Sequence, residues 1–288
     1  RRPFLLSRSG APGIQRFGVA MWSGDIATTE ESLAEHFNAQ VHLGLSGIDY
    51  FGSDVGGFFR EEFAGTPEEL DWLYTRWFAA ACAVDVPIRP HAFNLENRHR
   101  TSPDRIGHLD SNRENLRWRY RLLPYYYSLA HRAARLGDPL VAPPGLWFPQ
   151  WDSGAALTGN LKMVGPDLLV ALCADLRARE LAVELPPQDW IDLRTGQRHR
   201  GSAALPLLRE GRFELPLLAR AGSILPMAVV DPATRNTSGR HDGQQAEDLV
   251  LRVHSGPQAG SFELIEDDGW TVAYRTGELT RTTVHRQT

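Results

Sequence analysis

The sequence predicts a fold with two successive parts, half of a parallel (β/α)8 barrel followed by an all-β region. Up to Gly137, short apolar runs alternate with stretches of helical periodicity, as in parallel α/β folds. Beyond Gly137, short extended segments are separated by Pro and Gly turns, which is typical of a β-sandwich. We therefore predict a barrel half over residues 1–137, a β-sandwich domain over residues 138–228, and a linker with the start of a further β-domain over residues 229–288.

Four apolar runs supply the predicted strands of the barrel half, at residues 3–8, 16–21, 45–51 and 86–93. A barrel of this class needs eight strands, so four strands cannot close one. We expect the first run to be a buried strand, and we expect the open barrel half as a whole to expose apolar strand edges.

Helices are predicted between these strands. Thr28 and Glu31 have the spacing of a capping box, so a helix should begin near Thr28 and end at Gly44. A second helix should begin at Thr66-Pro67, which pairs a capping residue with proline at the first helical position.

A further helix should run from Ser111 to Gly137, with a kink or break at Pro124. Residues 229–247, rich in Asp, Asn, Ser and Gly, predict a linker, and Asp268-Gly269 predicts a hairpin turn between two strands. The extended segments of the β-region are predicted at residues 168–173, 180–185, 190–193, 213–218 and 221–226.

The charge and hydropathy of the chain exclude several function classes. With 288 residues, a net charge of −4 and a pI near 6.2, nothing favours nucleic acid or an anionic membrane as a partner. No apolar run approaches the roughly 18 residues that a membrane-spanning helix needs. The chain begins without a start methionine or signal peptide, and we interpret it as a piece that begins inside a domain. The compartment is left unknown, with a soluble, cytoplasmic location favoured.

The sequence predicts no cofactor and no metal. Cys82 and Cys173 lie in apolar surroundings and are best interpreted as buried free thiols. Gly56-Gly57 stands alone and does not make a phosphate-binding loop. Tight metal-ligand spacing is lacking among the candidate ligands Asp49, Asp54, His36 and His42.

Two predicted strands end in loops that combine aromatic, small and acidic residues. The first loop is Trp22-Ser23-Gly24-Asp25, and the second, over residues 47–58, contains Asp54. In strand–helix folds of this kind, polar groups that do chemistry collect at the carboxyl ends of the strands.

Eight runs, in order along nearly the whole chain, are similar to a known family: SRSGAPGIQRFGVAMWSGD (7–25), GLSGIDYFGSDVGGF (44–58), RWF (76–78), IRPHAF (88–93), RYRLLPYYYSLAH (119–131), WIDLRTGQ (190–197), LLARAGSILP (217–226) and FELIEDDGWTVAY (262–274). They resemble glycoside hydrolase family 31, the α-glucosidase and α-xylosidase family. The resemblance implies that the barrel half is the carboxyl-terminal half. It also implies that the strand with the nucleophilic aspartate, and the family's amino-terminal β-domain, precede residue 1.

The resemblance implies catalytic and sugar-binding roles. Asp25 would be the general acid/base, while Arg8 and His91 would hydrogen-bond hydroxyls of the sugar in the −1 subsite. Retaining cleavage needs two carboxyl groups about 5 Å apart on opposite faces of the anomeric carbon. The alternatives are purely structural roles. Asp25 would cap the following helix, Arg8 would form a structural ion pair with Asp54, and His91 would be an ordinary core or surface residue.

The resemblance also implies walls for that subsite. Trp22, Asp54 and Phe58 would line it, with Asp54 also orienting Arg8, and Arg89 would support the loop that holds His91. Plain core packing is the alternative for the two aromatic residues.

The predicted function is that of a retaining, exo-acting α-glycosidase, in first place an α-glucosidase, which hydrolyses terminal α-linked sugars by double displacement. An α-transglucosidase or α-xylosidase would use the same residues, and a non-catalytic carbohydrate-binding or scaffold fragment is the alternative outside enzymes. The predicted partners are an α-glucoside or oligosaccharide and the amino-terminal remainder of the same protein, without nucleic acid or membrane. We expect the chain alone to be inactive, because the nucleophile would lie upstream. The sugar and the linkage stay open, and they would depend on upstream loops and on the polar stretch at residues 94–107.

Overall fold

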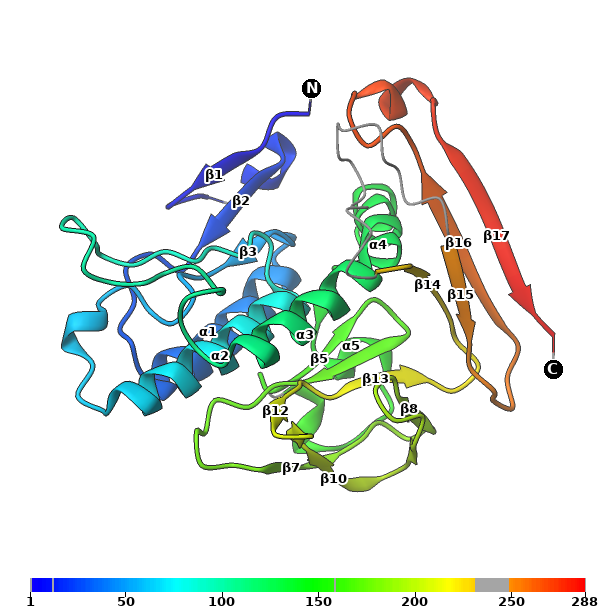
Figure 1. Cartoon of the computed structure of the whole chain (residues 1–288). Helices are drawn as coiled ribbons and strands as arrows, with labels where there is room; N and C mark the ends of the chain where they lie inside the picture. Colours follow the sequence, from blue (N-terminus) through cyan, green and yellow to red (C-terminus); the bar gives the residue numbers. More distant parts are fainter. Residues whose placement is uncertain (1, 12, 158, 231–248, 288) are drawn as a thin grey trace.

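The structure, a computed structural model, describes residues 2–11, 13–157, 159–230 and 249–287. It contains a small parallel sheet with two long helices, a pair of helices in the middle of the molecule, an antiparallel sheet, and a long terminal hairpin (Figure 1). The predicted linker at residues 229–247 lies almost entirely outside the described residues. The predicted boundaries between the three regions stay predictions.

The parallel sheet has three strands in the order in which they occur along the chain. They are β1 (Leu5–Ser7), β2 (Val19–Trp22) and β3 (Phe51–Gly52), and both pairs are parallel. Helix α1 (Glu30–Leu45) connects β2 to β3, and α2 (Pro67–Val84) follows β3. This is the alternation of strand and helix that the sequence predicts for a piece of a barrel.

The predicted fourth strand, at residues 86–93, is wrong as a strand. The segment runs beside β3, with the Val86 amide donating to the Phe51 carbonyl at 3.0 Å, but it forms only one isolated bridge, between Asp54 and Arg89. Pro87 and Pro90 have no backbone N–H, so they cannot continue a ladder of hydrogen bonds.

The first strand is shorter and more exposed than predicted. Phe4, Leu5 and Leu6 are 63%, 47% and 36% exposed, whereas the sequence predicts a buried strand. Within the described residues β1 pairs only with β2 and is an edge strand, which matches the expected exposure of an open barrel half. The second strand begins three residues later than predicted, because residues Ile14–Phe17 form the 3-10 helix η1.

The first long helix begins one residue later than predicted. Thr29, not Thr28, is its N-cap, and the Thr29 hydroxyl accepts a hydrogen bond from the Ser32 amide at 3.1 Å. Thr28 is buried against Gly57, where a Cβ on the glycine would lie 2.5 Å from the threonine Oγ. Tertiary packing therefore takes Thr28 away from the capping position.

The other helices follow the sequence more closely. The predicted Thr66 cap of α2 forms, and Glu69 completes it as a capping box, with Thr66 and Glu69 each accepting from the other's backbone amide. The long predicted helix is divided at Leu122 into α3 (Leu109–Arg121) and α4 (Leu123–Leu136), which confirms the break expected from Pro124.

The β-region contains a six-stranded sheet in the order β4-β5-β6-β13-β8-β9. Each described neighbouring pair in it is antiparallel. The sequence prediction missed the first two strands and the last strand of this order. The bounds are β4 (Val141–Ala142), β5 (Leu161–Val164), β6 (Leu168–Ala171), β8 (Trp190–Asp192), β9 (Arg198–His199) and β13 (Leu217–Arg220).

The remaining strands form two-stranded antiparallel pairs. These are β7 (Glu180–Glu184) with β10 (Ser202–Pro206), β11 (Leu208–Arg209) with β12 (Arg212–Phe213), β14 (Ile224–Ala228) with β15 (Leu249–Val253), and β16 (Gly260–Glu266) with β17 (Thr280–Arg286). Short helices complete the chain at α5 (Pro144–Trp147), η2 (Arg60–Glu62), η3 (Gly154–Leu157) and η4 (Ala273–Thr276).

Asp268-Gly269 does not make the predicted tight hairpin turn. The connection from β16 to β17 spans residues 267–279 and includes η4. The Asp268 carboxylate accepts from the amides of Trp270 and Thr271, both at 2.9 Å, and so stabilises a longer loop.

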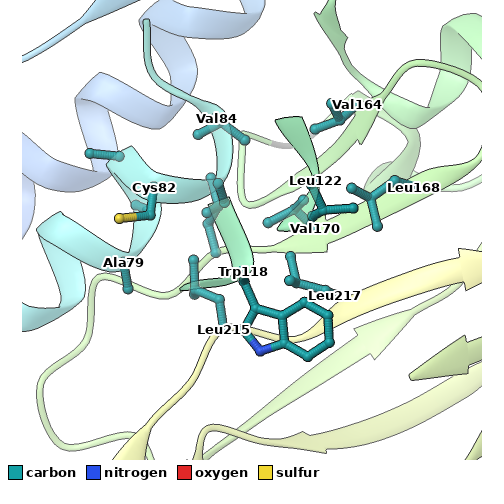
Figure 2. Packing of buried hydrophobic residues seen from close by; sticks show 14 of the residues in the cluster. Ala79, Cys82, Val84, Trp118, Leu122, Val164, Leu168, Val170, Leu215 and Leu217 are labelled. Carbon is teal, nitrogen blue, oxygen red and sulfur yellow. The ribbon is translucent and has the colours of Figure 1, made fainter. Parts of the chain in front are cut away.

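One hydrophobic core joins the parallel part to the antiparallel sheet. Figure 2 shows side chains of α2 and of the α3–α4 junction meeting side chains of β5, β6 and the chain around β13. The labelled residues are Ala79, Cys82, Val84, Trp118, Leu122, Val164, Leu168, Val170, Leu215 and Leu217. Cys82 and Cys173 are buried free thiols, as predicted.

A buried polar group also lies between the two parts. Lys162 on β5 is the only lysine in the sequence, is fully buried, and donates its ammonium hydrogen to the carbonyl of Phe37 on α1. Burial lowers the pKa of Lys162 to about 7, against the opposing effect of the Asp85 charge. Asp85 accepts hydrogen bonds from His36 and Gln40, at 2.9 Å and 3.0 Å.

Substitution of Leu122 by alanine should destabilise the chain strongly. Leu122 is 1% exposed at the centre of the shared core, so we expect a loss of about 2–5 kcal/mol in the free energy of unfolding, measured in urea. Leu136→Ala is the matched control, because this leucine is 58% exposed and should cost under about 0.5 kcal/mol. Equal losses in the two variants would contradict the assigned core.

The single lysine should make stability depend on pH above neutrality. Because its pKa of about 7 lies below the ordinary value of 10.5, the unfolded chain binds the extra proton in this range. The free energy of unfolding should therefore rise with pH between about 7 and 9, by up to about 1.4 kcal/mol per unit. Urea unfolding at these pH values should show a smaller rise in Lys162→Met. In NMR spectra of protein labelled with carbon-13 at lysine, the side chain of Lys162 gives the lysine signal. A pH titration of that signal with a midpoint near 10 would refute the lowered pKa of Lys162.

Candidate active site

The candidate site is built where β2 and β3 end. The parallel register places Trp22 opposite Gly52, and the Ser23 amide donates to the Gly52 carbonyl at 3.1 Å. The loops that carry Asp25 and Asp54 therefore leave the sheet at the same edge. The sequence periodicity predicts that strands end near these positions, and the register of β2 and β3 shows that the two loops are neighbours.

Asp25 pairs with Arg8. The Arg8 Nη2 atom lies 3.0 Å from Asp25 Oδ2, with the two side chains 59% and 30% exposed. Gly24, between Ser23 and Asp25, has a positive φ of 78°, a backbone conformation that glycine adopts at no steric cost. Asp25 does not cap the following helix, because Thr29 does so. The alternative reading of Asp25 as a helix cap is therefore wrong.

Asp54 pairs with Arg89, not with Arg8 as the resemblance implies. Arg89 Nε donates to Asp54 Oδ1 at 2.5 Å, and a backbone bridge joins the same two residues. Asp54 is fully buried. Burial raises its pKa above the ordinary value and outweighs the guanidinium of Arg89, which lowers it. The expected orientation of Arg8 by Asp54 is thus corrected, since each carboxylate holds a different arginine.

Arg89 also contacts the aromatic side chain at the end of β2. Its guanidinium carbon lies 4.7 Å from the centre of the Trp22 ring, which is a cation–π contact. Its carbonyl accepts from the Val55 amide at 2.9 Å. A single arginine therefore fixes Asp54, Trp22 and the segment that leads to His91.

Phe58 lies beside His91 and also beside Phe93. The ring centres are 5.6 Å and 5.9 Å from that of Phe58. Backbone hydrogen bonds align three segments in this region, since the Phe58 amide donates to the Ile26 carbonyl at 2.8 Å and the Phe93 amide donates to the Phe58 carbonyl at 2.9 Å. These hydrogen bonds connect Ile26, the residue after Asp25, through Phe58 to Phe93 at the end of the 86–93 segment.

The sequence reasoning missed Phe93 as part of this group. His91 and Phe93 are two residues apart in an extended segment, so their side chains point to the same side. That alternation, together with the ring of Phe58, is the signal that could have identified it. The structure brings the seven predicted site residues together in three sets of contacts. Arg8 pairs with Asp25, Arg89 contacts both Asp54 and Trp22, and Phe58 lies beside His91.

Two of the candidate metal ligands, Asp49 and His36, make structural contacts. Asp49 accepts from the Leu140 amide at 2.6 Å, and His36 pairs with Asp85 at 2.9 Å. Among residues 2–11, 13–157, 159–230 and 249–287, no three His, Cys, Asp or Glu side chains are grouped as a metal site would need. None of the helices in these ranges has both the length and the apolar character that a bilayer crossing requires.

The arrangement can act on a neutral polyhydroxyl ligand. It offers one accessible carboxylate, one accessible guanidinium, and an imidazole beside an aromatic ring, all at the open end of parallel strands. A carboxylate can exchange a proton, and a guanidinium presents several donors in a fixed plane.

Comparison with known proteins gives a consistent result. The model of the glycosyl hydrolases family 31 TIM-barrel domain matches residues 1–129, and that of the family 31 C-terminal domain matches residues 137–225. The chain is 32% identical to a probable glucan 1,3-alpha-glucosidase of Oryza sativa subsp. japonica, over 99% of this chain and 29% of the relative. It is 33% identical to the neutral alpha-glucosidase AB of Homo sapiens, over 96% of this chain and 28% of the relative.

Solved structures agree. The GH31 alpha-xylosidase from Xanthomonas citri aligns with a TM-score of 0.79 and 30% identity, over 98% of this chain and 30% of that one. A glucosidase II alpha subunit aligns with a TM-score of 0.82 at 24% identity and supports the fold alone. The chain spans a little under a third of the length of these proteins. Because the models of the barrel domain and of the carboxyl-terminal domain together match most of the chain, the chain belongs to glycoside hydrolase family 31.

Proposed function

We propose that the protein containing this chain is a retaining, exo-acting α-glucosidase, and that this chain supplies the acid/base half of its site. The observation that carries the proposal is the accessible Arg8–Asp25 pair at the carboxyl end of β2. It occurs in a chain whose matched relatives include α-glucosidases.

Asp25 is the proposed general acid/base. As a carboxylic acid it donates its proton to the glycosidic oxygen as the bond to the anomeric carbon breaks. As a carboxylate it then takes a proton from the water that attacks the glycosyl-enzyme intermediate. The intermediate requires a second carboxylate about 5 Å away on the other face of the sugar. We place that nucleophile in polypeptide upstream of residue 1, so the chain alone is inactive.

Arg8 and His91 are the proposed contacts to the sugar hydroxyls. Arg8 is 59% exposed, so its outer N–H groups are open to a ligand even while one of them contacts Asp25. A sugar hydroxyl that takes over this N–H frees the Asp25 carboxyl to face the glycosidic oxygen. His91 stands beside the ring of Phe58 and is also exposed.

Trp22 and Phe58 form the proposed walls of the −1 subsite, and the fully buried Asp54 supports Trp22 through Arg89. The guanidinium of Arg89 contacts both the Asp54 carboxylate and the Trp22 ring, which holds Trp22 in place before a ligand arrives. Such pre-organisation lowers the entropic cost of binding, because these side chains are already ordered before the ligand arrives.

A second candidate activity is that of an α-xylosidase. Two xylosidases resemble this chain, the structure from Xanthomonas citri at 30% identity and a protein of Saccharolobus solfataricus at 29% identity. The same residues would act, and initial rates on paired aryl α-glucoside and α-xyloside substrates decide between the two. Transfer to a sugar hydroxyl in place of water is the transglucosidase variant of the same mechanism.

Asp25→Asn in the full-length polypeptide should lower kcat for an aryl or sugar α-glucoside about 100- to 10,000-fold, because the amide cannot donate or take the proton. The basic limb of the pH–rate profile should disappear. Asp110→Asn is the matched control, since Asp110 is 74% exposed in a surface pair with Arg113. Full activity in Asp25→Asn, or activity of residues 1–288 alone, would overturn the proposed mechanism; no activity in the wild-type full-length protein would favour a binding or scaffold role.

Arg89→Gln should leave the Asp54 carboxylate buried without its cation. The pKa of Asp54, already raised by burial, should rise further because the lowering effect of Arg89 is lost. The folded state then binds the proton more tightly than the unfolded chain, so the free energy of unfolding should fall as pH rises above about 4.

Urea unfolding at pH 4 and pH 7 measures this effect, with an expected extra loss at pH 7 of a few kcal/mol, about 3–5 at most. The double variant Arg89→Gln/Asp54→Asn should regain part of the stability, because it buries no charge. A single and a double variant with the same pH dependence would show that Asp54 is not the titrating group.

A further inference from the structure

We propose that Arg2 is a positioning residue for Arg8, and that the loop between β16 and β17 holds the amino end of β1 through Arg2. The proposal rests on the proposed function, in which Arg8 binds hydroxyls of the sugar, and it adds the contact that sets the place of Arg8. It makes a loop near the end of the chain part of the support of the sugar site.

Arg2 is bound by groups that lie far away in the sequence. Its backbone amide donates to the Trp270 carbonyl at 3.0 Å, and its Nε donates to the Thr271 carbonyl at 2.6 Å, across 269 positions of the chain. Its Nη2 lies 2.7 Å from Oδ1 of Asp267, and its Nη1 donates to the Tyr127 hydroxyl. The segment before β1 therefore lies against the loop between β16 and β17 (Figure 1).

Two aromatic rings contact the same guanidinium. Its carbon lies 4.7 Å from the ring centre of Tyr274 and 5.8 Å from that of Tyr127. A planar guanidinium can contact a ring with its face while its N–H groups donate in the plane, which the ammonium of a lysine cannot do. We call Arg2, Tyr127, Asp267 and Tyr274 the Arg2 clamp.

Asp267 is the buried anion of the Arg2 clamp. Its side chain is 1% exposed and accepts from the Tyr127 hydroxyl and, at 2.7 Å, from the Gly269 amide. Burial raises the pKa of Asp267, but the hydrogen bonds from Tyr127 and Arg2 outweigh it and lower the pKa below its ordinary value. Burial also lowers the pKa of His131, whose Nε2 lies 3.6 Å away, so His131 is not the cation at neutral pH. Loss of Arg2 would leave a buried charge uncompensated.

The loop that carries Asp267 is itself attached firmly to α4. The Ile265 amide, on β16, donates to the Ser128 hydroxyl at 3.0 Å, one residue after Tyr127. The carboxylate of Asp268 orders the following turn through the amides of residues 270 and 271. The Arg2 clamp is therefore a fixed point, and the chain before β1 is held to it.

The strand that follows Arg2 leads directly to Arg8. Within the described residues β1 pairs over Leu5–Ser7 with β2 alone, and only Pro3 and Phe4 lie between Arg2 and this strand. Six residues of strand cover about 20 Å and hardly stretch, and a proline favours an extended conformation at the residue before it. A shift of Arg2 along the strand direction therefore moves Arg8, and a misplacement of about 1 Å can cost an enzyme up to about 100-fold in rate.

Two variants weaken the Arg2 clamp in different ways. Arg2→Ala removes the cation, whereas Tyr127→Phe keeps the ring and removes only the hydroxyl that bridges Arg2 and Asp267. Arg135→Ala is the matched control, because Arg135 also joins α4 to the terminal hairpin. Its partner Glu263 lies on β16, in an exposed pair outside the loop that holds Arg2.

The experiment is a double-mutant cycle in the full-length protein, with kcat/KM measured on an aryl α-glucoside and Kd measured for glucose. Arg2→Ala should weaken both about tenfold and Tyr127→Phe about threefold, while Arg135→Ala should change them less than about twofold. In an Arg8→Ala background the loss from Arg2→Ala should disappear, because the residue through which Arg2 acts is gone. In a His91→Ala background the loss of about tenfold should persist, because His91 is the other proposed sugar contact and does not depend on β1.

Equal losses from Arg2→Ala in the wild-type and Arg8→Ala backgrounds overturn the proposal, because the Arg2 clamp would then only support the fold. The absence of any loss in both Arg2→Ala and Tyr127→Phe overturns it as well. If urea unfolding shows that Arg2→Ala does not fold, the same cycle with Tyr127→Phe decides. Failure of the proposed function is a different result, because Asp25→Asn would then keep the wild-type kcat/KM while the glucose cycle still reports on Arg2.

Discussion

The hydrophobic core shared by the two parts of the chain is the constraint on which the rest of the structure depends. Trp118 and Leu122, at the α3–α4 junction, pack between α2 and the six-stranded sheet, so neither part buries its apolar face without the other (Figure 2). Polar contacts cross the same boundary, since Lys162 of the sheet reaches the carbonyl of Phe37 in α1. The helices that connect and follow the site-bearing strands, α1 and α2, therefore pack against a sheet far away in the sequence.

The two ion pairs of the site differ in burial, and this difference suits two different roles. Asp54 is fully buried and held by Arg89, so breaking this pair leaves an uncompensated buried charge. The Arg8–Asp25 pair faces solvent, where such pairs contribute only about 0–1 kcal/mol. The first pair is suited to hold walls in place, and the second can exchange partners when a ligand arrives.

The candidate site lies at the carboxyl ends of the three parallel strands. Its residues come from three strand ends and from the 86–93 segment, and their side chains converge although they are up to 83 positions apart, from Arg8 to His91. Motif recognition proposed these residues, because the runs that contain them are long and keep their order. It was not enough to pair them, since the choice between Asp25 and Asp54 as the partner of Arg8 depends on the register and loop geometry of the folded sheet.

By itself the sequence determined what depends on neighbours along the chain: the Thr66 cap of α2, the break of the long helix near Pro124, and the free thiols. Only the tertiary structure decided what depends on distant partners. Thr28 was lost as a cap because Gly57 packs on it, and the 86–93 segment became a bridge beside β3 instead of a strand. The physical reason is the separation in sequence of the residues that interact. Hydrogen bonds between residues a few positions apart follow from the local sequence, whereas burial and charge pairing depend on which distant residues the fold brings into contact.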